Sequence, residues 1–359
     1  MSTAPPTNPT MGKKGIVGFV NLGNTCYLNT TLQCLLHTMP LTYFFILDKH
    51  TEVLRKDRPQ HVVTMQWAHV LGVAWKDERT EAISPKNFVR FISEVSGALK
   101  RQNKLTTEFR VGQQHDMVEF LQFMLDCFHE SMETKIDVAI CGEPQNRVDQ
   151  LMIESYKHFR QHYASKYSVV IDMLSGQYFT QVVTRDSVGP AEHAESFDPF
   201  TVLTLELPKA AKRCTLYECF DLMVRPEIIK GWKGVRCAAP RVIEKKTFLW
   251  KLPSIFVIHL KRFVNMYVKN TCEVEVPEEL DVSNYCMSYD NENARYRLYA
   301  VANHVGNLHF GHYYADCRSL RHGWHRFDDQ RVSTIHASDL NRSHAYCLFY
   351  YRLPNDRPE

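Results

Sequence analysis

Apolar residues recur at helical spacing in two segments of the chain. After Cys26, leucines stand at positions 28, 32, 35 and 36, which is the one-sided pattern of an amphipathic helix. A second pattern follows Asp116, which precedes Glu119 by three residues and so favours an N-cap with a capping box. Its apolar face is formed by Phe120, Leu121, Met124, Leu125 and Phe128. We therefore predict helices that begin near Cys26 and near Asp116.

Other segments complete an α+β pattern. Helices are predicted within 48–109, around a polar insertion, and at 148–162. A continuous apolar run at 252–263 predicts a buried strand whose end, Lys261 and Arg262, is solvated. Shorter strands are predicted at 169–171, 178–183, 201–207 and 345–352. Helices come first and strands later, without regular βαβ alternation, so the predicted fold class is α+β.

His312 and Asp328 stand at the two open ends of a predicted hairpin. An apolar strand begins at Gly311, a turn follows at 321–323, and the partner strand runs from Trp324 to Asp328. Such a hairpin brings the carboxylate beside the imidazole, which is how an acidic group orients a histidine for proton transfer. Because the chain has 17 histidines, most of them are expected to be structural. A catalytic role for His312 therefore requires a nucleophile elsewhere.

Cys26 occupies a position that stabilises a thiolate. The turn at 23–25 delivers it to the first turn of the predicted helix, where unpaired N–H groups and the positive dipole end favour an anion. A neighbouring imidazole lowers a cysteine pKa further. Asn21 carries an amide that can donate to a developing oxyanion. The alternative interpretation is an ordinary buried cysteine under a helix cap, since free cysteines are among the most buried residues.

These blocks resemble the cysteine and histidine boxes of the ubiquitin-specific protease family of deubiquitinases. Residues 18–29 are similar to the cysteine box almost residue for residue, and residues 311–313 with 324–329 resemble the histidine box, in the same chain order. The resemblance implies five catalytic residues: Cys26 as nucleophile, His312 as general base, Asp328 as orienting acid, Asn21 as oxyanion donor and Asp329 as a substitute for Asp328.

The resemblance also implies an architecture and a reaction. The fold would be that of a papain-like cysteine protease in one catalytic domain at 15–359, with a helical thumb (15–167), β-rich fingers (168–250) and a β-sheet palm (251–359). The reaction would be hydrolysis of the isopeptide or peptide bond after the C-terminal glycine of ubiquitin, through a thioester on Cys26 and without a cofactor. The ubiquitin tail would be bound by six residues: Gln114, Asp116, Glu119, His304, Gly311 and Tyr313.

Metal binding is not expected. Many family members hold a structural zinc in the fingers through two Cys-x-x-Cys pairs, whereas this chain offers Cys214 and Cys219, five apart in a predicted helix, and His193 as a further donor. A second candidate set is made of His304, His309, His312 and Asp316. A metal there would remove His312 from proton transfer, so this set is the weaker hypothesis.

Composition narrows the class of protein and its surroundings. A net charge of +3 without a dense basic run argues against nucleic acid, and apolar runs such as 43–47 are far shorter than the roughly 20 residues that cross a bilayer. The polar, proline-rich segment 1–14 is expected to be a flexible leader without a signal core. An odd count of 11 cysteines indicates free thiols in a reducing compartment, the cytosol or the nucleus.

Two other functions stay open at this stage. The chain is alternatively a catalytically silent scaffold that binds ubiquitin, although intact Cys26, His312 and Asp328 argue against it. It is alternatively a protease for another ubiquitin-like modifier, because the fingers depart from the family pattern. The expected partners are ubiquitin or ubiquitinated proteins, and an activating protein partner is compatible with the sequence.

Overall fold

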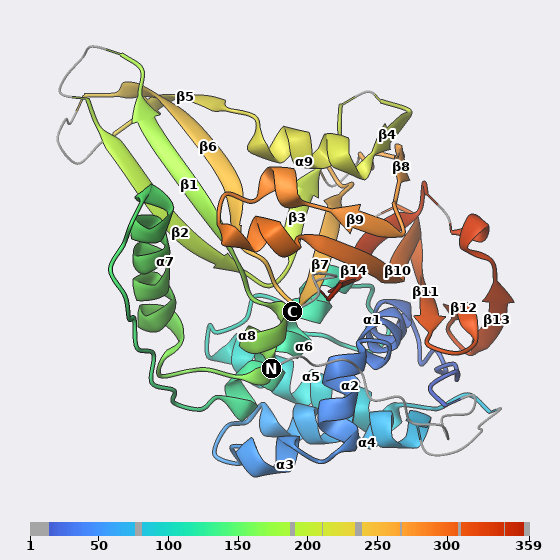
Figure 1. The fold of residues 1–359 in the computed structure, drawn as a ribbon. Helices are drawn as coiled ribbons and strands as arrows, with labels where there is room; N and C mark the ends of the chain where they lie inside the picture. Colours follow the sequence, from blue (N-terminus) through green and yellow to red (C-terminus); the bar gives the residue numbers. More distant parts are fainter. Residues whose placement is uncertain are drawn as a thin grey trace.

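The computed structural model describes residues 14–75, 81–186, 191–209, 211–233, 239–265, 268–307, 310–340 and 342–354. Helices make up most of the N-terminal part, the blue to teal layer at the bottom of Figure 1. The α-helices of the described residues are α1 (Cys26–Leu36), α2 (Met39–Ile46), α3 (His50–Val53), α4 (His61–Trp75), α5 (Lys86–Arg101), α6 (Met117–Met132), α7 (Arg147–Tyr163), α8 (Val169–Leu174) and α9 (Leu216–Val224). The predicted helices near Cys26, near Asp116 and at 148–162 are confirmed.

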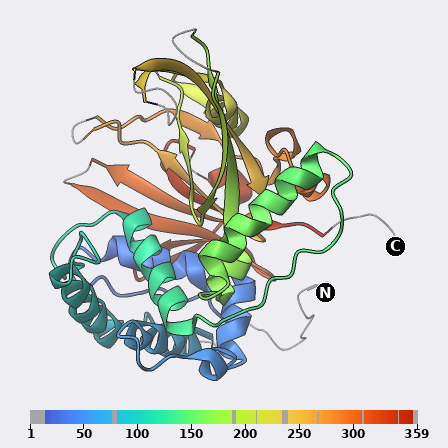
Figure 2. The same ribbon diagram turned by 90° about the vertical axis from the view of Figure 1, so that its left-hand side faces the viewer.

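Two larger sheets follow. The first has the strand order β2-β1-β6-β5 and projects to the upper left of Figure 1, and the second runs β13-β12-β11-β10-β14-β7-β3 with β9 beside β10. The strands are β1 (Gly176–Thr184), β2 (His193–Phe200), β3 (Leu203–Glu206), β4 (Arg213–Thr215), β5 (Glu227–Trp232), β6 (Arg241–Lys251), β7 (Ile255–Lys261), β8 (Glu273–Glu275), β9 (Glu279–Asp281), β10 (Arg295–Gly306), β11 (Gly311–Ser319), β12 (Gly323–Asp328), β13 (Arg331–Ile335) and β14 (Ala345–Arg352). Figure 2 shows the projecting sheet edge-on, above the helical layer. The predicted α+β fold is confirmed.

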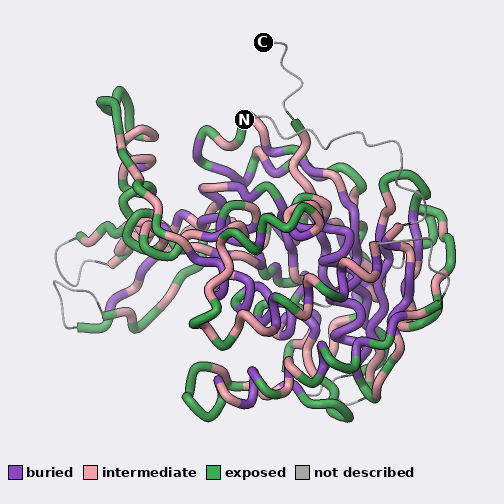
Figure 3. Tube along the Cα trace, turned by 90° about the horizontal axis from the view of Figure 1, so that it is seen from below, coloured by how far each residue is buried: buried purple, intermediate pink, exposed green. Residues whose placement is uncertain are grey.

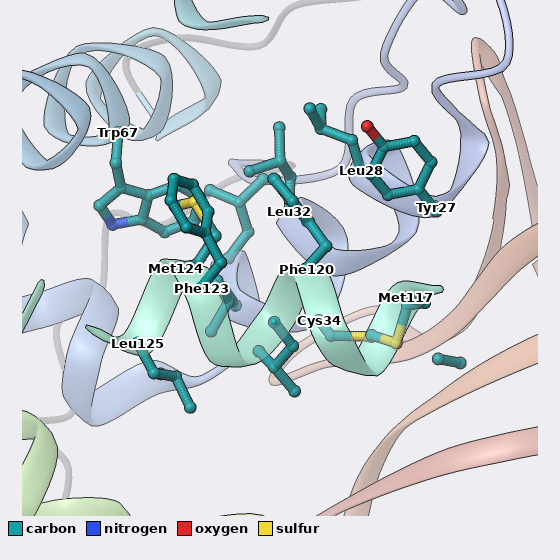
Figure 4. Close-up of a cluster of buried hydrophobic side chains, with 14 of the residues drawn as sticks. Tyr27, Leu28, Leu32, Cys34, Trp67, Met117, Phe120, Phe123, Met124 and Leu125 are labelled. Carbon is teal, nitrogen blue, oxygen red and sulfur yellow. The ribbon is translucent and has the colours of Figure 1, made fainter. Parts of the chain in front are cut away.

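The main core lies between the helices and the larger sheet. α1 lies against both α6 and β11, and every residue of α1 is buried. Figure 4 shows Leu28 and Leu32 of α1 meeting Phe120 and Phe123 of α6, with Trp67 of α4 beyond them. Figure 3 shows the same distribution along the whole trace, with buried segments concentrated in this body and exposed ones at its outer loops. α1 is therefore a central element that the rest of the core holds in place.

Two sequence predictions about local structure are wrong. Residues 169–171 lie in helix α8 instead of a strand, because Ser168 caps the helix through Ile171 N and the apolar positions 170, 171 and 174 fall on one buried face. Cys214 lies in β4, although a helix was expected there, and only Cys219 lies in helix α9. Short apolar runs do not distinguish a buried helix from a strand by periodicity alone.

Arg262 also departs from its prediction as a solvated strand end. Its side chain is fully buried, and its guanidinium donates to the backbone oxygens of Ala345 (2.6 Å), Cys272 (2.8 Å), Asn270 (3.1 Å) and Arg342 (3.1 Å). Burial lowers the pKa of Arg262 to about 10. The neighbouring Lys261 is exposed, as predicted, and pairs with Glu206. Arg262 therefore fastens the segment after β7 to the start of β14.

The projecting sheet contains a second buried arginine. Arg241, at the start of β6, donates through Nε to Asp186 Oδ1 at 2.9 Å and lies 3.7 Å from Glu192. The carboxylate of Asp186 also accepts from the backbone N–H of Val242. An ion cluster of this kind joins the strands at the far end of the sheet, in addition to strand pairing and packing.

In the described residues, none of the helices combines the length and the apolar character needed to cross a bilayer.

Replacing Arg262 by methionine should lower the free energy of unfolding by about 3 kcal/mol, because four carbonyl groups lose their donor, and the bonds to Ala345 and Cys272 are buried. The matched control is Lys261→Met, which removes the same charge one position earlier from an exposed ion pair and should change stability by less than about 1 kcal/mol. Denaturant unfolding monitored by tryptophan fluorescence measures both. Equal effects of the two substitutions would contradict this assignment.

Candidate active site

The loop before α1 presents Cys26 at an uncapped helix N-terminus. Gly23 (φ +107°) and Asn24 (φ +53°) form the turn, and both adopt the left-handed region that glycine and asparagine tolerate best. The hydroxyl of Thr25, the N-cap residue, accepts from Leu22 N at 2.9 Å and makes no capping bond to the helix. The first N–H groups of α1 are therefore left for another acceptor beside Cys26.

His312 and Asp328 meet across the hairpin of β11 and β12, as predicted. The strands pair antiparallel from Ser319 opposite Gly323 to Ala315 opposite Phe327. This register brings the ring Nε2 of His312 to 2.6 Å from Asp328 Oδ1. The packing of α1 against β11 brings Cys26 into hydrogen-bonding contact with the same ring. The three side chains expected to act together are thus adjacent.

The charge on the His312 ring is stabilised by its two neighbours. The hydrogen bond with Cys26 is the largest cause that raises the pKa of His312, to about 9, and Asp328 raises it further while burial opposes both. A ring with this pKa carries a proton at neutral pH. The Asp328 carboxylate bonds to the ring Nε2, and Cys26 acts on the same ring.

The carboxylate of Asp329 bonds to other partners than that of Asp328. Its carboxylate accepts from the side-chain amides of Asn21 (2.8 Å) and Asn29 (2.8 Å), and its backbone oxygen accepts from Phe19 N. Nevertheless, its carboxylate lies within 4.8 Å of the ligand atoms of His312 and Asp328. The Oδ1 of Asn21 accepts from the N–H groups of Gly23 and Thr25. These two bonds identify the oxygen and the nitrogen of the Asn21 amide. Asn21 therefore turns its NH₂ group toward Asp329, with a second hydrogen available.

A pocket of about 260 Å³ opens beside Cys26. This volume is slightly below the range of about 300–1,000 Å³ that is usual for small-molecule sites, so the pocket suits a slender occupant. The predicted residues Gln114, Asp116, His304, Gly311 and Tyr313 contribute to its wall. The remaining lining residues were not predicted as part of a site: Tyr27, His115 and Phe263.

Gln114 spans the pocket wall to Gly311. Its amide donates to the Gly311 oxygen at 3.1 Å and accepts from the Gly311 N–H at 3.3 Å, as a neighbouring strand would. Gly311 has no room for a side chain, because a Cβ there would stand 2.2 Å from His304 Nε2. Both residues therefore fix the backbone directly before His312.

The two acidic residues of the α6 N-terminus have different surroundings. Asp116 caps α6 through the N–H groups of Val118 (2.8 Å) and Glu119 (2.9 Å), as predicted, and its other oxygen accepts from the phenol of Tyr346. Glu119 does not line the pocket, and its carboxylate accepts from the Thr107 hydroxyl. The structure thus brings Asp116 to the pocket and leaves Glu119 outside its wall.

His115 and Phe263 complete the wall with aromatic surface. The ring of His115 lies edge-on to Tyr27 and Phe109, with centroids at 5.2 and 5.1 Å, and burial lowers its pKa. Phe263 follows directly after Arg262 at the end of β7. A sequence signal for both existed, because His115 stands within the predicted helix start and Phe263 ends the predicted strand.

The weaker metal set is not assembled. The Asp316 carboxylate is buried and accepts from Arg326 and Asn303, and the Nδ1 of His304 accepts from Lys269. His309 lies outside the described residues. In the described part of the chain, the residues grouped closely enough to share an ion are His312, Asp328 and Asp329, whose oxygens and ring already bond to one another or to Asn21 and Asn29.

Comparison with known proteins decides the family. The sequence profile described as ubiquitin carboxyl-terminal hydrolase matches residues 17–350. The chain belongs to this family. Similar curated members are ubiquitin carboxyl-terminal hydrolase Usp2 of Drosophila melanogaster (31% identical, 94% of this chain and 35% of that protein) and ubiquitin carboxyl-terminal hydrolase 2 of Bos taurus (30% identical, 96% and 57%). The chain thus spans about one third to just over one half of the length of these family members. The predicted family resemblance is confirmed.

Solved structures share the fold of this ubiquitin carboxyl-terminal hydrolase family member. One is the SAGA DUB module of Ubp8, Sgf11, Sus1 and Sgf73 bound to monoubiquitin, with a TM-score of 0.70, 22% identity, and coverage of 98% of this chain and 72% of the matched one. Another is the same module bound to ubiquitin aldehyde, with a TM-score of 0.69, 23% identity and coverage of 98% and 72%. At this identity the likeness supports the fold.

The His312 ring should titrate at about pH 9 in the folded protein, as followed by NMR of its ring protons. Because the folded pKa is raised, the contribution of His312 to stability is complete below the unfolded value of about 6.5 and disappears as pH rises through 9. Asp328→Asn and Cys26→Ala each remove one interaction that raises the pKa of His312, so each should lower the pH midpoint of its titration. A midpoint that neither substitution moves would contradict the three-residue arrangement.

Proposed function

We propose that this family member is a thiol-dependent deubiquitinase that hydrolyses the isopeptide or peptide bond after the C-terminal glycine of ubiquitin. The observation that carries the proposal is the contact of Cys26 with His312, whose ring is held by Asp328, at the end of a narrow pocket. The names of the curated family members support the same reaction. The proposed reaction uses side-chain and backbone groups of the chain itself.

Acylation begins from the thiolate and imidazolium pair. The Cys26 sulfur attacks the carbonyl carbon of the terminal glycine, and His312 delivers its proton to the leaving lysine amine. The product is a thioester on Cys26. His312, now neutral, takes a proton from a water molecule, whose oxygen attacks the thioester carbonyl carbon. The C–S bond then breaks, which releases the ubiquitin C-terminus as a carboxylate and restores the thiolate and imidazolium pair. Asp328 keeps the ring oriented in both steps through its 2.6 Å bond.

The developing oxyanion is stabilised by two donors in this proposal. One is the backbone N–H of Cys26, in the uncapped first turn of α1. The other is the Asn21 amide, whose NH₂ group has one hydrogen bonded to Asp329 and one available. Asp329 is then a positioning residue for Asn21, and Asn29 holds Asp329 in turn. Each oxyanion donor is worth about 3 kcal/mol of transition-state stabilisation.

The pocket between Asp116 and His304 is the proposed site of the ubiquitin tail. Its aromatic walls and small volume suit an extended chain of glycines and exclude larger side chains. The Asp116 carboxylate stands at this pocket and would form a charge-assisted hydrogen bond with an arginine of the tail. Glu119 would contribute at longer range, because its carboxylate is engaged by Thr107.

Partners, location and domain division follow as further parts of this proposal. The matched SAGA structures contain ubiquitin and additional subunits, so an activating partner is compatible with the fold. The free cysteines of the described residues fit the cytosol or the nucleus. In this proposal the thumb corresponds to the helical layer, the fingers to the projecting sheet and the palm to the larger sheet. The larger sheet also contains β3, which precedes the proposed start of the palm at residue 251.

Cys26→Ala should abolish hydrolysis of a fluorogenic ubiquitin substrate while leaving ubiquitin binding largely intact, because only the nucleophile is lost. A ubiquitin probe with an electrophilic C-terminus should label the unaltered protein at Cys26 and leave the variant unlabelled. Binding without an adduct would favour the silent scaffold. Labelling by a probe of another ubiquitin-like modifier in preference to ubiquitin would favour the alternative protease.

Asp328→Asn and Asp329→Ala should affect catalysis in different ways. Asp328→Asn lowers the His312 pKa and kcat together. Asp329→Ala should lower kcat by about tenfold, because it loosens the oxyanion donor Asn21, and should shift the His312 titration less than Asp328→Asn does, because Asp329 makes no hydrogen bond to the ring. Asn21→Ala should lower kcat by about 100-fold. Steady-state kinetics with fluorogenic ubiquitin and NMR titration of the ring measure these effects. A shift of the His312 titration in Asp329→Ala as large as that in Asp328→Asn would contradict the separate roles.

A further inference from the structure

Lys269 ties two loops together behind the pocket wall. It pairs with Phe263 in an isolated bridge after β7. Its ammonium donates to three acceptors at the end of β10: Nδ1 of His304 (2.9 Å), the His304 oxygen (2.7 Å) and the Gly306 oxygen (3.2 Å). Three acceptors match the three hydrogens of an ammonium group. All three ammonium hydrogens of Lys269 are therefore bonded, two to His304 and one to Gly306 in the turn that follows.

The surroundings of Lys269 are unusual for a lysine. Among the described residues its ammonium pairs with no carboxylate, and the charged group that acts on it is the guanidinium of Arg262. Burial, with a smaller contribution from Arg262, lowers the pKa of Lys269 to about 8. At neutral pH the ammonium form still predominates. A donor without a counter-ion beside the site indicates a function in orienting its acceptors.

The contact with Lys269 determines the hydrogen positions on His304. An ammonium hydrogen can bond to Nδ1 only when that nitrogen offers a lone pair, so the ring is neutral and Nε2 carries the hydrogen. Burial and the nearby Lys269 and His312 lower the pKa of His304 to about 3, in agreement with a neutral ring. The tautomer is thus fixed by a side chain from another loop.

The Nε2 atom of His304 lies on the side of Gly311, which also lines the pocket. A Cβ on Gly311 would stand 2.2 Å from this nitrogen. Tyr313 and Phe263 hold the ring, with centroids at 4.5 and 5.5 Å. Within the described residues Nε2 has no hydrogen-bond acceptor. Its hydrogen is therefore available to a group that enters the pocket.

We propose that Lys269 is a positioning residue for tail recognition, which fixes His304 as a neutral donor whose Nε2–H bonds to a backbone carbonyl of the bound tail. Glycine residues offer no side chain, so a site that selects them has to bind their peptide groups. A permanent donor at this position serves that purpose. The identity of the occupant rests on the proposed function, whereas the tautomer of His304 does not.

The tautomer is tested directly by ¹⁵N NMR of the free protein, with the His304 signals assigned by comparison with His304→Gln. Between pH 6 and 7.5 the unaltered protein should show a neutral ring protonated at Nε2. In Lys269→Met, which lacks the donor, the ring should populate the Nδ1–H tautomer as well. A protonated ring, or an Nδ1–H tautomer in the unaltered protein, would overturn the proposal whether or not the protein is an enzyme.

Kinetics with fluorogenic ubiquitin test the consequence for the tail. Lys269→Met should raise KM by about tenfold and leave kcat unchanged, because the lost interaction serves binding. Lys269→Arg, which keeps the charge and donors, should restore part of the loss. Lys261→Met, which removes an exposed lysine at the end of β7, should behave as the unaltered protein. An unchanged KM in Lys269→Met would overturn the proposal.

Stability measurements separate positioning from folding. The unfolding midpoint of each variant is compared with that of the unaltered protein. If Lys269→Met is poorly folded, the second variant is Lys269→Gln, which keeps donor hydrogens on a neutral side chain. Lys269→Gln should retain the Nε2–H tautomer with an intermediate KM. The opposite outcome is a KM that rises only in proportion to the loss of folded protein while the His304 tautomer stays unchanged. That result would overturn the proposal in favour of a structural role.

Discussion

The contact between α1 and β11 is the constraint on which the site depends. Cys26 and His312 are far apart in the chain, and they meet because the buried helix α1 packs against the strand that carries the imidazole. The resulting hydrogen bond raises the His312 pKa to about 9. Since α1 is buried along its whole length, the core that surrounds it also fixes the position of the sulfur. Core packing and thiol reactivity are thus set by the same helix.

Amides bonded to fixed partners surround this pair. Asn21 is oriented by the turn before Cys26 and by Asp329, Asn29 supports Asp329, and Gln114 pairs with the backbone of Gly311. Each amide is a neutral group with a defined direction, which arranges donors without adding charge to the site. In the proposed reaction, amides that are oriented before the substrate arrives would reduce the reorganisation needed in the transition state.

Features that depend on short-range pattern were predictable from the sequence. The helix at Cys26, the cap of α6 by Asp116 and the hairpin that joins His312 to Asp328 all follow from spacing and turn residues. The helix α8 was mistaken for a strand, because a run of three apolar residues carries no period of its own. Local signals thus located the elements that carry Cys26, His312 and Asp328, and failed where a segment was short.

Contacts between distant segments were not predictable in the same way. Arg262 follows an apolar strand and was expected in solvent, yet it is buried and donates to four carbonyl groups from two other segments, 270–272 and 342–345. Asp329 was expected to substitute for Asp328, but the left-handed backbone at Asp329 (φ +51°) directs its carboxylate to Asn21 and Asn29. Such polar side chains are placed by the groups they bond to, which are backbone carbonyls for Arg262 and side-chain amides for Asp329. A sequence shows which donors exist, and only the fold shows which acceptors they reach.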